Sequence, residues 1–233
     1  AYLSYNVAIG TNLESELTLA FDVLDYALLS APGAPLKQAL IDAGIGKDIM
    51  GGFDNSTLQP IFSVVAKNAN KEDEEKFVGI IEDTLKKIVK DGLNRKSLLA
   101  GINSEEFKFR EADYGNFPKG LIYGLSCMDS WLYDDEPFLY LKILDVFAVL
   151  KEKIETGYFE ELIQKYLLDN SHKSYVSIEP EKGLNARLEK ELEEKLAAYK
   201  KDLSEEEIDK LVEDTKHLKQ YQEAVSYTHL RAH

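Results

Sequence analysis

The stretch LDYALLSAPGAPLKQAL, residues 24–40, indicates two helices separated by a break at Pro32–Gly33. Apolar residues recur at helical spacing before the break, so residues 14–30 are predicted to form a helix with one face in the core. After the break, Pro35 fits the first turn of a second helix, where a proline loses no helical hydrogen bond. Almost no charged side chain lies near the break, although 30% of the chain is charged. We therefore expect the break to lie against the core or an interface.

The segments around this break predict an α+β domain in which an antiparallel sheet packs against helices. Residues 2–9 alternate between apolar and polar, which is typical of a half-buried strand. Residues 47–53 and 59–67 are predicted to be the two strands of a hairpin. Since Pro60 has no N–H to donate, we expect the second of these strands to start at an edge or a bulge. The other predicted elements are helices over residues 70–92, 94–111, 119–131, 137–153 and 157–168, and a last strand over residues 173–180.

The character of the chain changes after Pro180, which predicts a boundary between residues 1–180 and a helical hairpin over residues 181–224. Half of the positions in the second segment are charged, and two narrow apolar stripes run at helical spacing. Two antiparallel helices that lie against each other and against something else would bury these stripes. Ser204 and Glu207 have the spacing of a capping box at the start of the second helix. The tail over residues 225–233 matches nothing before it. We expect it to be foreign and exclude its two histidines from the site.

Composition limits the classes of partner. The chain has 28 basic and 42 acidic residues, a net charge of −14, which argues against nucleic-acid binding because that requires cations. A basic peptide partner stays open, as does the simpler alternative of a solvated acidic surface. No apolar run reaches the roughly 18 residues of a membrane helix, so no membrane partner is expected. No signal peptide is visible, and the start within a strand pattern suggests an excised fragment.

The sequence offers no recognisable catalytic group. Zinc hydrolysis needs an H-x-x-E-H or H-E-x-x-H helix, whereas His172 and His217 have no partner at helical spacing. The single cysteine, Cys127, excludes an internal disulfide and suits a reducing compartment, such as the cytoplasm of a bacterium. Its apolar context, GLSCMDSW, is typical of an inert core cysteine rather than a nucleophile.

Three stretches together resemble presequence protease-type enzymes, which are zinc metallopeptidases of the inverted-zincin pitrilysin and insulinase family. They are APGAPLKQALIDAGIGKDIMGGFDNSTLQPIFSVVAKNAN, READYGNFPKGLIYGLSCMDSWLYDD and GYFEELIQKYLLDNSHKSYVSIEPEKGL. The resemblance runs from residue 2 to residue 224. It implies that residues 1–180 are a second, non-catalytic α+β domain in the wall of a peptide chamber, and that residues 181–224 are the helical hairpin between two halves of the enzyme.

The resemblance also implies a counterpart for residues 24–40 in the family's first domain. The corresponding helix of the family's first domain carries H-x-x-E-H, and counting back from Pro32–Gly33 places these positions on Asp25, Leu28 and Leu29. Leucine has no lone pair to donate to a metal, so this is a degenerate zinc motif. The parent protein is then a zinc metalloendopeptidase for short unfolded or presequence-like peptides, whose zinc is held by another domain. This piece alone is expected to hold no metal or other cofactor and to be inactive.

The same family pattern implies that an edge strand pairs with an extended peptide substrate. The matching positions here are Asp48, Ile49, Met50, Gly51, Gly52 and Phe53. An exposed strand edge offers unpaired N–H and C=O groups to such a peptide. The alternative is that the glycines only turn the chain within a closed hairpin. The expected partners are the remaining domains of the polypeptide and extended peptides. A non-catalytic scaffold of the same fold, like the core proteins of respiratory complexes, and a free-standing acidic peptide-binding module stay open as alternatives.

Overall fold

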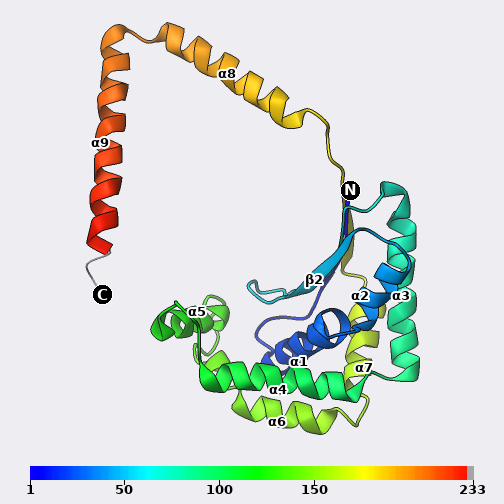
Figure 1. The fold of residues 1–233 in the computed structure, drawn as a ribbon. Coiled ribbons are helices and arrows are strands. Elements are labelled where there is room, and N and C mark those ends of the chain that lie inside the picture. Colours follow the sequence, from blue (N-terminus) through cyan, green and yellow to red (C-terminus); the bar gives the residue numbers. More distant parts are fainter. Residues whose placement is uncertain (230–233) are drawn as a thin grey trace. The chain divides into compact units, whose positions relative to one another are not determined.

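A computed structural model describes the backbone of residues 1–229 and the side chains of residues 1–224. The prediction of a foreign tail at residues 225–233 therefore lies outside the described side chains. The chain divides into two compact units, Ala1–Glu179 and a second that begins at Pro180. Each is described by itself. In the first unit a four-stranded antiparallel sheet packs against helices, so the predicted α+β class is confirmed (Figure 1).

The elements of the first unit follow the order expected from the periodicity. The strands are β1 (Tyr2–Ala8), β2 (Asp48–Asp54), β3 (Ile61–Lys67) and β4 (Lys173–Ile178). The α-helices are α1 (Ser15–Asp25), α2 (Pro35–Asp42), α3 (Glu74–Asp91), α4 (Arg95–Glu111), α5 (Lys119–Trp131), α6 (Leu144–Lys153) and α7 (Tyr158–Leu162). Two π-helical segments, η1 (Tyr26–Ser30) and η4 (Ile163–Leu168), extend α1 and α7, and two short 3₁₀ turns are η2 (Lys71–Asp73) and η3 (Leu139–Leu141).

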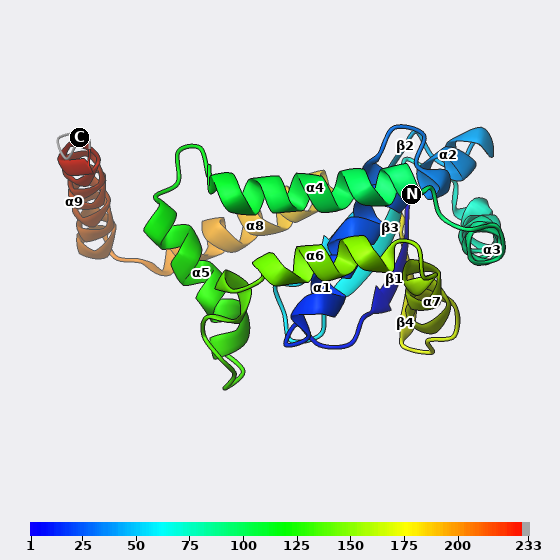
Figure 2. The same cartoon turned by 90° about the horizontal axis from the view of Figure 1, so that it is seen from below.

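The sheet has the strand order β2-β3-β1-β4, and all three pairings are antiparallel. Apolar residues at alternate positions of β1 point to one face and are fully buried, among them Leu3, Tyr5 and Val7. Helices α1, α4 and α6 lie on one side of β1 and β3 (Figure 2). The core is centred on Phe21 of α1, whose ring lies 5.4 Å from that of Phe53, measured between centroids.

The opposite face of the sheet carries exposed apolar side chains from all four strands. They are Tyr2, Met50, Ile61, Val176 and Ile178. Because successive residues of a strand point to opposite faces, these side chains stand on the far side of the sheet from the buried ones. The first unit therefore leaves a partly apolar sheet face open.

The structure corrects the expectation for Pro60. We expected the strand that follows it to begin at an edge or a bulge, but β3 lies inside the sheet between β2 and β1. Pro60 stands one residue before the strand, where no ladder donor is needed, and its carbonyl oxygen accepts a hydrogen bond from the Ile9 N–H at 2.8 Å.

The second unit contains α8 (Leu184–Asp202) and α9 (Glu205–His229). The capping box is present, since the Ser204 N–H donates to Glu207 Oε2 at 2.8 Å and the Glu207 N–H donates to Ser204 Oγ at 3.3 Å. The expected burial of the two stripes on each other is not seen, because Leu192 is 55% exposed and Leu218 is 55% exposed. A seam one residue wide on each helix buries too little apolar surface to hold two helices together without a further layer.

Candidate functional site

The three positions predicted to be a degenerate zinc motif, Asp25, Leu28 and Leu29, lie where α1 passes into η1. Leu28 is fully buried and Leu29 nearly so, and both belong to the hydrophobic core of the unit. Neither side chain carries a donor atom, and Asp25 is the one ligand-type residue of the three. Within the described residues, no group of three or more His, Cys, Asp and Glu side chains is placed to hold a metal ion. This segment does not fit a zinc ion.

Asp25 nevertheless occupies an unusual environment for a carboxyl group. Burial, together with the negative charge of Glu105 on α4, raises the pKa of Asp25 to about 6. Its Oδ1 atom is buried and has no hydrogen-bond partner. One turn earlier, burial and the charges of Glu105 and Asp25 raise the pKa of Asp22 to about 8. Two carboxyl groups with raised pKa values therefore lie side by side on α1.

The strand β2 runs beside Asp25 at the end of the sheet. It pairs with β3 on one side, and no strand among the described residues pairs with its other side. A Cβ placed on Gly52 would lie 3.6 Å from Asp25 Oδ2. The predicted peptide-binding positions Asp48–Phe53 are thus all on an edge strand, and its middle passes close to Asp25.

Gly51 is required by the geometry of this edge. Its φ of +154° is accessible to glycine but rarely to other residues, and a Cβ there would stand 2.2 Å from the Ser63 carbonyl oxygen of β3. A side chain at this position would force β2 away from β3. The glycines therefore allow β2 to pair closely with β3 while its far side stays unpaired.

A hollow of about 330 Å³ borders the first half of β2. Its wall is formed by Asp48–Gly51 together with Leu29, Ser30 and Lys37. The helix end predicted to carry a degenerate zinc motif and the edge strand β2 therefore line the same hollow. Sequence reasoning had singled out both segments but gave no reason to expect them to be adjacent.

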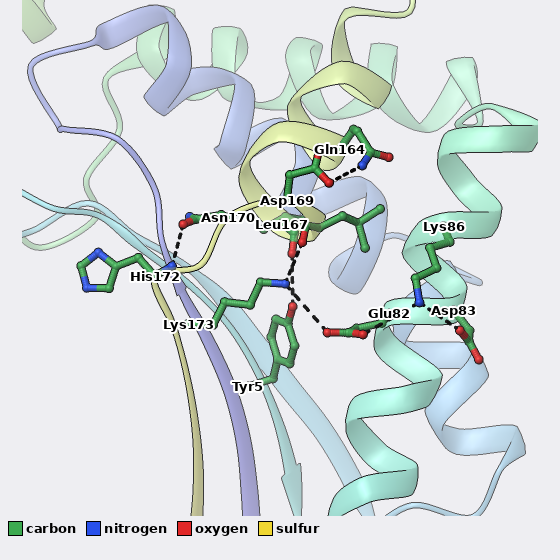
Figure 3. A network of polar contacts seen from close by, with 11 residues as sticks. Tyr5, Glu82, Asp83, Lys86, Gln164, Leu167, Asp169, Asn170, His172 and Lys173 are labelled. Atoms are coloured by element: carbon green, nitrogen blue, oxygen red, sulfur yellow. Dashed lines mark hydrogen bonds and ion pairs between the residues drawn. The ribbon is translucent and has the colours of Figure 1, made fainter.

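The other edge of the sheet, β4, is fixed by polar contacts to the helices (Figure 3). Lys173 Nζ donates to the Leu168 carbonyl oxygen at 3.0 Å and lies 3.8 Å from Glu82 of α3, while the Tyr5 hydroxyl donates to the Leu167 carbonyl oxygen at 3.2 Å. These contacts tie β4 and β1 to the C-terminal end of η4, where carbonyl groups have no helical partner. A hollow of about 800 Å³ between β4 and α3 is lined largely by charged side chains.

Asp22 and Glu105 are the residues near this site that sequence reasoning missed. They belong to α1 and α4, and no spacing in the sequence relates one to the other. A signal for the close approach of these helices does exist in the interior of α4. Gly101 is a glycine within a helix, and a Cβ there would lie 3.1 Å from the ring of Tyr26.

The structure corrects the expectation for Cys127. We expected it to be a core cysteine, but the residue is only half-buried, because α5 does not enter the core. Across the described residues, no helix has the length and apolar character needed to cross a bilayer.

Two family models match the chain. The model for the peptidase M16 inactive domain matches residues 2–104, and the model for the segment associated with subfamily C of the M16 peptidases matches residues 178–231. These matches agree with the resemblance inferred from the sequence.

Two relatives extend the agreement over nearly the whole chain. Protein HypA of Clostridium perfringens is 45% identical over 222 residues, which is 95% of this chain and 23% of the relative. Presequence protease 1 of Arabidopsis thaliana, a chloroplastic and mitochondrial protein, is 34% identical over 217 residues, which is 91% of this chain and 20% of the relative. The chain thus spans between a fifth and a quarter of the length of these relatives.

Solved structures agree on the fold. The inactive peptidase domain of a proposed zinc protease from Bordetella parapertussis matches with a TM-score of 0.62 at 12% identity, over 78% of this chain and 94% of that one. A protease from Helicobacter pylori matches with a TM-score of 0.56, also at 12% identity, over 77% of this chain and 41% of that one. The order of elements, the two family models and the relatives lead to one conclusion: the chain belongs to the M16 peptidase family and contains its inactive domain followed by the segment associated with subfamily C.

Proposed function

We propose that this chain is the substrate-holding part of a longer zinc peptidase that degrades short, unfolded or presequence-like peptides. Residues 1–180 would form part of the wall of the peptide chamber, and residues 181–224 would connect two halves of the enzyme. The zinc ion and the general base would come from another domain of the same polypeptide. The names of the relatives and the inactive-domain match support this assignment.

The observation that carries the proposal is the unpaired side of β2. Gly51 lets β2 lie close to β3, and the neighbouring hollow leaves room along Asp48–Gly51 for a second chain. An extended peptide that adds to this side would form main-chain hydrogen bonds whatever its sequence. Such pairing suits an enzyme that acts on many different peptides.

The net charge of the chain supports a preference for basic peptides among the possible substrates. The chain has a net charge of −14, and the carboxyl group of Asp25 lies beside the middle of β2. A negative wall raises the local concentration of cationic peptides and accelerates their association. Basic peptides are therefore expected to bind more tightly than acidic peptides of equal length, by a margin that shrinks as salt is added.

The test is a binding measurement on the 233-residue chain with a fluorescent, extended basic peptide. An added strand uses the N–H group of every second peptide residue. Methylating the backbone nitrogen at one set of alternate positions should abolish binding, and methylating the intervening set should leave it nearly unchanged. A photoreactive copy of the peptide should attach to residues 48–54.

Attachment to residues 173–178 would assign binding to the opposite edge and overturn the assignment to β2. No binding at all would favour the alternative, a scaffold domain that takes no part in substrate capture. The missing metal is tested separately: metal analysis of the isolated chain should find no stoichiometric zinc. One equivalent of zinc that disappears in the variant Asp25→Ala would contradict the degenerate-motif interpretation.

A further inference from the structure

Helix α5 exposes its apolar side, which a surface helix of a free-standing domain ordinarily buries. Its apolar stripe consists of Leu121, Leu125, Met128 and Leu132, which follow one another at helical spacing and are between 37% and 61% exposed. A surface helix ordinarily turns such a stripe toward the core and its polar residues toward water.

The polar side of α5 is the one that holds it to the rest of the first unit. Ser130 is fully buried and its hydroxyl donates to the Glu136 carbonyl oxygen at 2.7 Å. The Asp129 carbonyl oxygen accepts a hydrogen bond from the Asn12 side chain, also at 2.7 Å. Hydrogen bonds therefore orient the helix so that its apolar stripe points away from the domain.

The exposed apolar surface continues beyond the stripe. Phe117 just before α5 is 63% exposed, and Trp131 at its end is 60% exposed. Monomeric proteins rarely leave large apolar patches uncovered, and tryptophan is one of the residues enriched at the energetic centre of interfaces. We refer to Phe117, Trp131 and the four stripe residues as the α5 patch.

We propose that the α5 patch docks onto an apolar surface of another domain of the same polypeptide. This inference rests on the proposed function, in which the chain is one part of a longer peptidase. The relatives are more than four times as long as the matched region, so most of their length lies outside it and is available to cover the patch. None of the six patch residues is charged, which matches an apolar partner surface and not the basic peptides proposed for β2.

The experiment compares side-chain exposure in two settings. The first is the isolated 233-residue chain, and the second is a chimera in which this chain replaces the matching 222 residues of the Clostridium perfringens relative. Hydroxyl-radical footprinting reads the oxidation rates of Met128 and Trp131. We expect both rates to fall several-fold in the chimera.

Two matched variants separate docking from general effects. Leu125→Glu places a charge in the patch, and Ile41→Glu places the same charge at an apolar residue of α2 that is also about half exposed. Leu125→Glu should restore the oxidation of Trp131 in the chimera, and Ile41→Glu should not. Both variants should leave the melting temperature of the isolated chain unchanged, because neither side chain belongs to the core.

Equal oxidation of Trp131 in the two settings would overturn the proposal. The proposal would also be overturned if Trp131 became protected in the isolated chain as the concentration rises and sedimentation showed dimers. The patch would then be covered by a second copy of the chain. If the chimera does not fold, the only tryptophan of the chain can be replaced by 5-fluorotryptophan. Its ¹⁹F resonance should then shift when the separately expressed remainder of the relative is added. None of these outcomes depends on peptide binding at β2, so the two proposals fail independently.

Discussion

At the scale of single residues, the contact between α1 and α4 brings three carboxyl groups together where water is scarce, so that Asp22 stays mostly protonated at pH 7. Asp22 and Asp25 both have raised pKa values because burial disfavours their charged forms and Glu105 adds like charge. Ionising a carboxyl group in this contact lowers the free energy of unfolding. Asp25 is the member of this contact that lies beside the edge strand β2, where the proposed function places basic peptides.

The destabilisation caused by burying Asp22 can be measured through the pH dependence of the free energy of unfolding. Its pKa is about 8 in the folded chain against an ordinary value of 3.8, so the folded state binds more protons than the unfolded state between these values. Stability should fall as the pH rises from about 4 to about 8, by at most about 1.4 kcal/mol for each pH unit. The variant Asp22→Asn should remove the part of this fall that Asp22 causes, keep the smaller part that Asp25 causes below about pH 6, and be the more stable protein at pH 8. Urea unfolding at pH 5 and pH 8 checks it.

Asp83→Asn is the matched control, because the Asp83 side chain is 81% exposed and should not change the pH dependence. If stability depends on pH in the same way in Asp22→Asn and in the original chain, the pKa of Asp22 is not raised in the folded state.

Gly51 gives a second prediction at this scale. In the variant Gly51→Ala, the new Cβ meets the Ser63 carbonyl oxygen and the residue must also hold a φ that disfavours side chains. Strain of this kind costs about 1–3 kcal/mol, so the free energy of unfolding should fall by that amount. Peptide binding should weaken at the same time, because β2 would move away from β3.

Gly79→Ala is the control for this substitution. Gly79 lies within α3 with open space around its Cβ position, so alanine there should stabilise the protein by up to about 1 kcal/mol. Unaltered stability of Gly51→Ala would mean that β2 tolerates a shift at this point, and the close pairing of the edge would lose its explanation.

At the scale of elements, periodicity predicted most of the secondary structure correctly. The long helix α3 lies within the predicted range of residues 70–92 and buries Phe77, Ile81, Leu85 and Ile88, which follow one another at helical spacing. The last turn of the helix predicted over residues 14–30 widened into the π-helix η1, and the predicted helix over residues 137–153 was divided into η3 and α6. These differences arise where helices meet the core, because packing overrides local preference there.

Lys173 adds to the attachment that β4 gains by pairing with β1, which gives a prediction at the scale of elements. Lys173 is 13% exposed at its side chain and joins the end of η4 to Glu82 of α3. Replacing it in the variant Lys173→Met leaves the Leu168 carbonyl group and Glu82 without this donor, which should cost about 1–3 kcal/mol. Hydrogen exchange at the amides of β4 should accelerate.

Lys86→Met provides the comparison, since Lys86 also lies near Glu82, at 3.9 Å, but its side chain is 60% exposed (Figure 3). An exposed pair of this kind contributes at most about 1 kcal/mol. Equal effects of the two substitutions would show that the contact to the end of η4 contributes nothing.

At the scale of the whole molecule, the hydrophobic core belongs to the first unit. Every residue of the core cluster lies before residue 180, and Leu167 is the last of the buried ones. We predict that a chain ending at Pro180 keeps a single cooperative thermal transition with an unchanged midpoint. Loss of cooperativity in calorimetry would instead make the helices after Pro180 an integral part of the first unit. The full-length chain at equal concentration is the reference.

The sequence by itself determined the local elements, the capping box at Ser204 and the absence of metal-ligand atoms from the side chains of Leu28 and Leu29. Each of these depends on the chemistry or spacing of neighbouring residues, which is visible without a structure. The approach of β2 to Asp25, the approach of Glu105 to Asp22 and the outward turn of α5 were decided by the tertiary structure alone. They depend on which distant segments bury each other most favourably, a choice that the free energy of the whole fold makes and that no local spacing records.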